Sequence, residues 1–331
     1  MPSIIQGECH LPDRASPRKI LADHPKRVSG IHSDADFLYT WGPGYVAEGN
    51  SYPTGTVFIY NKQKNFKLDG MIVGFSQDIY CAISTDDHII VGGGGGKDLT
   101  GYRYSVLRLY NKETQLLEQD WGGDEYRVTS LFADEKYVYA GTSNSTLLVH
   151  DKATMREIKS IYHFVDQSPG THIASDKSRL YCGAGNGTVK AWSKETWTPG
   201  PSLESGGGMI THVIARDGRV FAADESGNVI AWNAGDLVAT LCIHACDGPV
   251  RGMTLSGQHV FIGDASGTIS GWNTSDFQKV LSFEGGKVAI SVLHADDVHI
   301  YSGCDDGAVL VWDVAEIIGR KKKVRNRYAG R

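Results

Sequence analysis

The chain of 331 residues repeats one type of strand ending at intervals that cluster at forty residues. At each ending, an apolar segment closes on an aromatic residue or His, which Asn, Asp or Ser follows. The endings are Tyr60-Asn61, Tyr110-Asn111, His150-Asp151, Trp192-Ser193, Trp232-Asn233, Trp272-Asn273 and Trp312-Asp313, separated by 50, 40, 42, 40, 40 and 40 residues. A period of this length, built only from short strands, is typical of a radial array of four-stranded sheets.

A second pattern lies upstream of each ending and supports the same repeat. An apolar residue is followed, usually after Ser or Thr, by a second apolar residue at the fourth position. The fourth residues are Ile31, Ile83, Leu131, Ile173, Val213, Met253 and Leu293, and seven positions later stand Leu38, Ile90, Val138, Leu180, Val220, Val260 and Ile300. Turns such as Ser266-Gly267 then lead into segments that alternate apolar and polar residues, as hairpins do. The sequence therefore predicts seven similar all-β units.

Over residues 18 to 314 the chain resembles the WD40-repeat family of β-propellers. The best match is the last unit, Tyr301-Ser302-Gly303-Cys304-Asp305-Asp306-Gly307-Ala308-Val309-Leu310-Val311-Trp312-Asp313. The Gly-His dipeptide of the family is absent, and only His24 and His244 stand near its position. The resemblance implies an all-β, seven-bladed WD40-type β-propeller whose buried His, Ser/Thr, Trp and Asp tetrads are incomplete in most blades.

Three regions are expected: an N-terminal arm over residues 1–17, the propeller over 18–314 and a basic C-terminal tail over 315–331. A ring that ends on its third strand leaves an open sheet edge. Residues 18–23 are expected to supply an N-terminal outer strand in the last blade, because they precede the first unit as residues 278–282 precede the seventh. In the alternative, residues 323–328 supply that strand.

Signals for secretion, for a membrane and for a disulfide framework are missing from the sequence. The first ten residues lack a charged start followed by an apolar run, and no apolar stretch reaches membrane-spanning length. The six Cys have no framework spacing, which indicates reduced thiols and a cytoplasmic or nuclear protein. The segment 242–246 holds two Cys and one His but has no second ligand pair, so no metal is expected.

Charge is distributed unevenly. The segment from residue 316 to the end holds seven Lys/Arg and one acid, and without it the chain has 26 basic and 37 acidic residues, a net charge of −11. The basic tail contains Arg320, Lys321, Lys322, Lys323, Arg325 and Arg327. Three interpretations of it stay open: a solvated tail, a nuclear import signal, and a contact to nucleic acid or an acidic protein surface. The acidic body argues against nucleic acid lying across the disc itself.

No local motif for catalysis or for a cofactor is present. Gly92 to Asp98 differs from a phosphate-binding loop because Val91 stands where its first Gly belongs, and no helix is expected to follow. None of the twelve His has a Ser or Cys partner and an acid at a recognised motif spacing. A hydrolase site assembled from separated loops, for example around His172 or His212, leaves no such signature and stays an alternative.

Two surfaces are the candidate sites. Insertions in the first two units are expected to form an aromatic ridge for binding proteins, with Trp41, Tyr45, Tyr52, Tyr102, Tyr104, Trp121 and Tyr126. In the alternative, the two insertions pack on one another. The residue after the first apolar position of each unit is expected to face the central channel, and these residues are Ser29, Cys81, Thr129, Thr171, Thr211, Arg251 and Ser291. Arg251 either binds a carboxylate, a phosphate or the backbone of an inserted peptide, or it pairs with Asp247 or an acid of a neighbouring blade or reaches into channel water.

We therefore expect a non-enzymatic protein-interaction scaffold, a monomeric propeller that docks other proteins in a larger complex, without cofactor and without membrane contact. A ribonucleoprotein component held by the basic tail is the second hypothesis, and a propeller-type hydrolase is the third. The family's cullin-adaptor receptors carry Trp-Asp-x-Arg, whereas Ala315 stands at the corresponding position here. The sequence thus disfavours that class.

Overall fold

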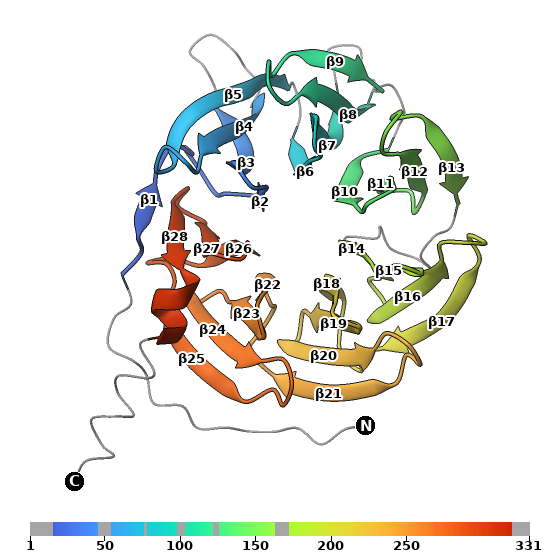
Figure 1. Cartoon of the computed structure of the whole chain (residues 1–331), viewed down its shortest axis with the longest axis vertical. Helices are drawn as coiled ribbons and strands as arrows, with labels where there is room; N and C mark the ends of the chain where they lie inside the picture. The colour runs from blue at the N-terminus through green and yellow to red at the C-terminus, as the bar shows by residue number, and fades with distance from the viewer. Residues whose placement is uncertain are drawn as a thin grey trace.

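The computed structural model describes residues 16–45, 54–75, 78–97, 103–121, 126–162 and 172–319. These residues form seven antiparallel sheets of four strands each, arranged as blades around one axis (Figure 1). The prediction of a seven-bladed, all-β propeller is confirmed.

The strands follow the order of the chain, except that the first strand belongs to the last blade. Blade 1 contains β2 (Gly30–Ser33), β3 (Phe37–Tyr45), β4 (Thr54–Asn61) and β5 (Lys67–Phe75); blade 2 contains β6 (Ile79–Ser84), β7 (His88–Lys97), β8 (Arg103–Asn111) and β9 (Leu117–Asp120). Blade 3 contains β10 (Val128–Ala133), β11 (Tyr137–Thr142), β12 (Leu147–Asp151) and β13 (Glu157–Ile161); blade 4 contains β14 (His172–Ser175), β15 (Arg179–Gly183), β16 (Thr188–Ser193) and β17 (Pro199–Glu204). Blade 5 contains β18 (Ile210–Arg216), β19 (Arg219–Asp224), β20 (Asn228–Asn233) and β21 (Ala239–His244); blade 6 contains β22 (Gly252–Ser256), β23 (His259–Gly263), β24 (Thr268–Asn273) and β25 (Lys279–Glu284). Blade 7 contains β26 (Ile290–Ala295), β27 (His299–Cys304), β28 (Val309–Asp313) and β1 (Lys19–Leu21).

The core lies between neighbouring blades, because most residues of the inner three strands are buried on both faces of each sheet. All six residues of β27 are buried, whereas all four residues of the outer strand β9 are exposed. Tight turns with Gly in the left-handed region join the strands. At Gly267 the φ angle is 85°, and an added Cβ would lie 2.6 Å from the carbonyl oxygen of Gly286. A side chain there would strain the turn and collide with backbone.

The extra residues of the first two units extend hairpins. Strands β3 and β7 run to Tyr45 and Lys97, and Gly92 to Gly94 pair with Leu107, Val106 and Ser105 of β8. Gly92 to Gly94 are therefore part of strand β7. Residues 46–53 and 98–102, the remaining parts of the two insertions, lie outside the described residues.

The predicted register of blade 2 is wrong by one residue. In the other six blades the fourth motif residue pairs with the residue nine positions later, as Leu131 does with Ala140. In blade 2 that relation holds for Ala82 and Val91, while Ile83 pairs with Ile90. The apolar residues 79, 82 and 83 satisfy two registers equally in the sequence, and strand pairing selects the one that begins at Ile79.

The N-terminal strand closes the ring, as predicted. Lys19 pairs with Val311 and Leu21 with Val309, and the backbone amide of Arg18 donates to the Val311 carbonyl at 2.7 Å. Leu21 is 5% exposed in the cluster between blades 7 and 1, whereas its neighbour Ile20 is 58% exposed. The first and last segments of the propeller are thus held together by backbone pairing and one buried side chain.

Replacing Leu21 by alanine is expected to lower the free energy of unfolding by about 2 kcal/mol, because it removes a buried side chain from the closure strand. Ile20→Ala provides the matched control in the same strand, with an expected loss below about 0.5 kcal/mol. Urea unfolding of both variants measures the two effects. Equal losses would contradict a closure strand anchored by Leu21.

A short helix at residues 314–319 follows β28, where the tail had been expected to begin. Ile317 and Ile318 are partly buried against the cluster between blades 6 and 7. No helix of the described residues is both long enough and apolar enough to cross a membrane.

Candidate functional site

The described aromatic residues of the predicted ridge pack into the propeller. Trp41 is 6% exposed and lies in the cluster between blades 1 and 2 with Ile72 and Ile79. Trp121 and Tyr126 are half-buried, and the Trp121 ring lies 5.5 Å from that of His150. Tyr45, Tyr52, Tyr102 and Tyr104 have no described side chains. Trp41 is therefore a core residue, and the prediction that it is an exposed anchor is corrected.

The position of Trp41 in its blade explains why it is buried. Its equivalents face the next blade and are small: Gly92, Gly141, Gly183, Ala223, Gly263 and Gly303. A Cβ on Gly183 would lie 2.5 Å from Ile210 of the following blade. In blade 1 the indole instead lies over Gly30, where a Cβ would be 2.0 Å from Trp41 Cζ2. The missing side chain of Gly30 makes room for the indole.

Hydroxyls at the predicted channel position bond to backbone carbonyls. Those of Thr129 and Thr211 donate to carbonyls of their own blades twelve residues later, at 3.2 and 3.3 Å, and that of Ser291 lies 2.9 Å from the Gly303 carbonyl of its blade and 2.7 Å from the Val28 carbonyl beside blade 1. In all three blades the residue is skipped in the strand pairing, as in a β-bulge. These side chains therefore stabilise the start of the inner strand.

The remaining channel positions differ from one another. Because of the corrected register, Tyr80 replaces Cys81 at this position in blade 2, and Cys81 is buried. Ser29 is exposed, and Thr171 lies outside the described residues. Arg251 directly precedes β22 and is half-buried. The expected pair with Asp247 is not formed, since Asp247 lies 3.4 Å from His244.

Two Ser–His pairs join blades near the ends of the inner strands. His294 Nε2 of blade 7 accepts from the backbone amide of Ser33 at 3.1 Å and lies 3.0 Å from its Oγ. His32 Nε2 lies 3.1 Å from the Ser84 hydroxyl, which donates to Asp34 at 2.8 Å. The first arrangement has the geometry of a nucleophile and its base, and 261 residues separate its partners in the chain.

The electrostatics of these pairs favour a structural role. Burial, together with the positive charge that His32 would carry, lowers the pKa of His294 to about 3. Burial lowers the pKa of His32 to about 4 despite the nearby Asp34. Imidazoles with such pKa values are weak general bases at neutral pH. The stacked rings of His172 and His212, 4.5 Å apart, also have lowered pKa values because of burial.

Three Asp–Tyr–Lys nodes connect blades 7 and 1, 1 and 2, and 3 and 4 at the turn between the first and second strands. In each node a Tyr hydroxyl donates to an Asp five residues earlier, and a Lys of the following blade pairs with the same carboxylate. The nodes are Asp34–Tyr39–Lys112, Asp134–Tyr139–Lys194 and Asp296–Tyr301–Lys62, with Lys–Asp distances of 3.0, 2.5 and 2.6 Å. Sequence reasoning missed these nodes, although the repeated spacing of Asp and Tyr marks them.

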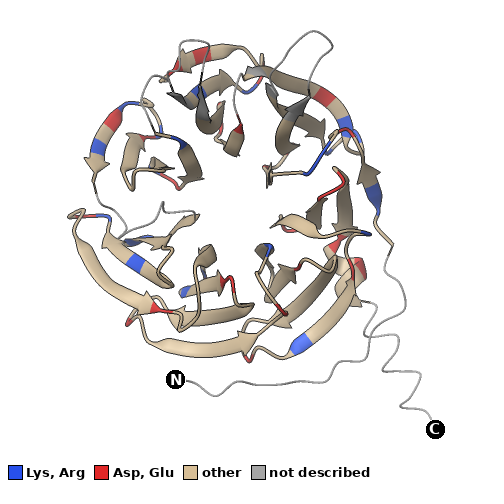
Figure 2. Ribbon diagram, turned by 180° about the vertical axis from the view of Figure 1, so that it is seen from behind, with Lys and Arg blue, Asp and Glu red and all other residues tan. Residues whose placement is uncertain are grey.

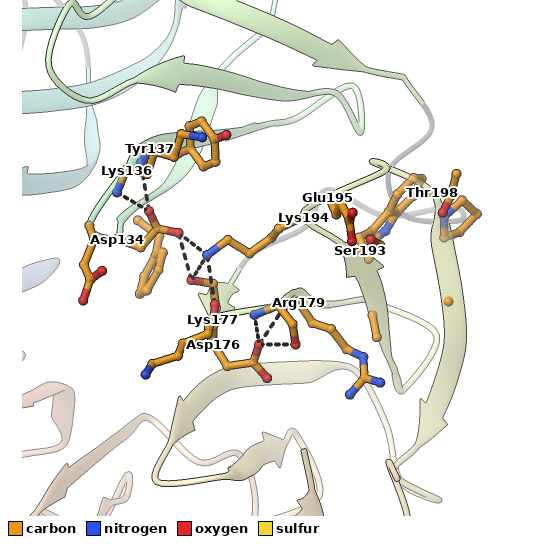
Figure 3. A pocket seen from close by; sticks show the side chains of 18 of the residues that line it. Asp134, Lys136, Tyr137, Asp176, Lys177, Arg179, Ser193, Lys194, Glu195 and Thr198 are labelled. Carbon is orange, nitrogen blue, oxygen red and sulfur yellow. Dashed lines mark hydrogen bonds and ion pairs between the residues drawn. The ribbon is translucent and has the colours of Figure 1, made fainter. Parts of the chain in front are cut away.

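The second of these nodes forms the floor of a surface depression of about 1150 Å³, which we call the 3/4 groove (Figure 3). It runs along the junction of blades 3 and 4. Lys194 Nζ donates to Asp134, to the carbonyl of Asp176 at 2.9 Å and to Ser175. Burial raises the pKa of Asp134, but the hydrogen bonds from Lys194 and from two backbone amides outweigh it and lower the pKa. The floor charges are therefore mutually satisfied.

The rim of the 3/4 groove carries charged side chains that are not paired within the described residues. Lys177 and Glu195 are exposed and have no hydrogen bond or ion pair within the described part of the chain. Lys136 lies over the ring of Tyr137, with Nζ 5.0 Å from the ring centre. The outer wall is formed by Pro199 to Pro201 of β17. The groove thus combines a fixed floor with apolar walls and free charges at its edge.

The junctions of blades 4/5 and 5/6 use a different contact. Asp176 and Tyr181 are present, at 2.7 Å, but Ala234 stands where the other nodes have Lys. Arg179 reaches across instead and donates to the carbonyl of Ala234, and Arg219 does the same to Thr274 of blade 6. At these two junctions an Arg of the preceding blade reaches forward, whereas in the nodes a Lys of the following blade reaches back.

Charges of both signs are spread around the described part of the ring (Figure 2). The residues of the basic tail, Arg320 to Arg331, lie outside it. Among the described residues, no group of three or more His, Cys, Asp or Glu side chains is arranged to hold a metal ion.

No protein-family model matches the chain, and no curated protein matches it. Among solved structures, the crystal structure of the computationally designed Ika8 protein is similar, with a TM-score of 0.64 and 20% sequence identity. The match covers 88% of this chain and 97% of the Ika8 chain. At this identity the likeness concerns the fold alone.

Proposed function

We propose that this protein is a WD40-type propeller that acts as a non-enzymatic docking platform, with the 3/4 groove as a surface that binds a partner protein. The observation that carries the proposal is the contrast within this groove. Its floor is a closed network around Lys194, whereas Lys177 and Glu195 on its rim are exposed and unpaired. Free charges around an apolar wall suit the polar rim of a protein interface.

The chemistry available elsewhere supports docking over catalysis. The imidazoles near Ser33 and Ser84 have pKa values of about 3 and 4, far below the range of an effective base at neutral pH. The five described cysteines are free thiols, which suits an assembly in the reducing cytosol or nucleus.

Reversing the two rim charges is expected to weaken partner binding about tenfold or more. The variant Lys177→Glu/Glu195→Lys keeps the net charge and removes nothing from the floor of the groove. Glu284→Lys/Lys287→Glu is the matched control, because both residues are exposed and unpaired in the described structure. Quantitative affinity purification of the full chain compares the three proteins.

The proposal requires partners that the wild type and the control retain and the rim variant loses. Identical partner lists for the rim variant and the wild type would exclude the 3/4 groove as a docking surface. Thermal unfolding of each variant shows that the fold is intact.

A further inference from the structure

Arg251 occupies a position where the other described blades have Ser, Thr or Tyr. It directly precedes β22, the innermost strand of blade 6 (Figure 1), and its backbone amide donates to the carbonyl of Gly263 at 3.0 Å. The equivalent hydroxyls of Thr211 and Ser291 bond to the backbone. In blade 6 the backbone amide of Arg251 itself makes the bond to the carbonyl twelve residues later, so the guanidinium is not needed for it.

The Arg251 side chain is without a partner in the described structure. Its Nε atom is buried and makes no hydrogen bond, and no ion pair involves its guanidinium. Other half-buried arginines are engaged: Arg108 bonds to Asp120, and Arg179 bonds to backbone carbonyls. A buried N–H without an acceptor costs free energy, so this group favours any acceptor that reaches it.

Four aspartates of blades 5 to 7 and their connections make contacts with other groups. Asp247 lies beside His244, and Asp224 and Asp264 accept backbone amides of their own turns at 2.9 to 3.0 Å. Asp305 pairs with Arg27 at 3.3 Å. No hydrogen bond or ion pair joins Arg251 to these carboxylates in the described structure.

We infer that Arg251 binds a carboxylate group of a ligand or partner at the start of the inner strand of blade 6. The planar fork of a guanidinium matches the two oxygens of a carboxylate. Phosphate has the same shape but carries about −1.5 to −2 charges at neutral pH. A body with a net charge of −11 repels it more strongly than a singly charged carboxylate. This inference does not depend on the 3/4 groove, and the two are tested separately.

The test observes the guanidinium of the full chain directly. With ¹⁵N-labelled arginine, the buried Nε–H of Arg251 is expected to give a resolved signal that is missing in Arg251→Lys. Titration with sodium acetate should shift this signal saturably, and inorganic phosphate should require higher concentrations. Sodium chloride at equal ionic strength controls for salt, and Arg156, which is exposed and has no side-chain partner among the described residues, controls for the residue type.

A saturable shift of the Arg251 signal by acetate, retained in Arg156→Lys, supports the inference. Acetate binding measured by thermal stabilisation should weaken about tenfold to a hundredfold in Arg251→Lys, because the bidentate contact is lost. The inference is overturned if acetate and chloride shift the signal equally, if phosphate binds more tightly than acetate, or if the Arg156 signal responds in the same way. The measurement on the wild type stands even where the Lys variant does not fold.

Discussion

Replacing Lys62 by methionine is expected to lower the free energy of unfolding by about 3 kcal/mol. Lys62 links blade 1 to blade 7, since its Nζ donates to Asp296 and to the carbonyl of Asp34, both at 2.6 Å. Its side chain is 12% exposed and that of Asp296 is 19% exposed. Removing one partner of a largely buried pair leaves the other charge without compensation, which costs more than the pair itself contributes. Urea unfolding monitored by tryptophan fluorescence measures the loss.

Lys64 provides the matched control. It pairs with Asp69 at 3.3 Å but is 63% exposed, so Lys64→Met is expected to cost less than about 1 kcal/mol. The Lys62 variant should also raise the pKa of Asp296. In the wild type, burial acts to raise this pKa, but the hydrogen bonds from Lys62, Tyr301 and two backbone amides lower it to about 2. Equal destabilisation by the two methionine variants would contradict the role of the node.

Acidification from pH 7 to pH 4.5 is expected to destabilise the propeller by several kcal/mol. Burial lowers the pKa of His24, His32 and His172 to about 4 and that of His294 to about 3. Their pKa values in the unfolded chain are near 6.5, so the unfolded state binds more protons. The stability is complete above pH 6.5 and is lost as the pH falls toward the folded pKa values. Each such histidine adds at most about 1.4 kcal/mol per pH unit.

Urea midpoints measured from pH 8 to pH 4.5 check this slope. Asp34 and Asp296 have pKa values near 2 in the fold, so their contribution is lost only below about pH 4 and does not enter this window. In His24→Gln the slope should be smaller than in the wild type, because His24 is buried with its Nε2 2.6 Å from the Thr40 hydroxyl. A stability that is constant across the window would contradict the burial of neutral histidines.

The repeat in the sequence predicts the fold because each unit is one blade and pairs mainly with itself. Seven blades and closure by an N-terminal strand within residues 18–23 were predicted and are confirmed. The register of blade 2 does not follow, since Ile83 and Ala82 both satisfy the apolar pattern. The burial of Trp41 could not be predicted from the repeat pattern either. Its type suggests a surface anchor, but its place opposite Gly30 puts it between blades.

The candidate site was harder to predict than the fold, because its contacts connect different blades. Lys194 of blade 4 meets Asp134 of blade 3 across 60 residues of chain, and the Lys62–Asp296 node spans 234. No local spacing records such pairs. The repeats nevertheless indicate part of the nodes. Asp and Tyr occur together in blades 1, 3, 4 and 7, whereas blades 5 and 6 have Phe221 and Phe261 in place of Tyr. Comparison of the repeats with one another predicts which blades carry the hydroxyl and its acceptor.

Blade 7 is built from strands at both ends of the propeller sequence, so it is completed late during synthesis. Among the described strands of the propeller, its outer strand β1 is synthesised first and its partner β28 last. During translation, β1 therefore has no strand to pair with until β28 has emerged, although Leu21 also packs against Ile31 and Phe58 of blade 1. A chain cut short before residue 309 keeps both an unpaired N-terminal strand and an open seventh blade. Such incomplete products expose apolar surface to chaperones and proteases, so the cell has a physical signal that separates finished propellers from unfinished ones.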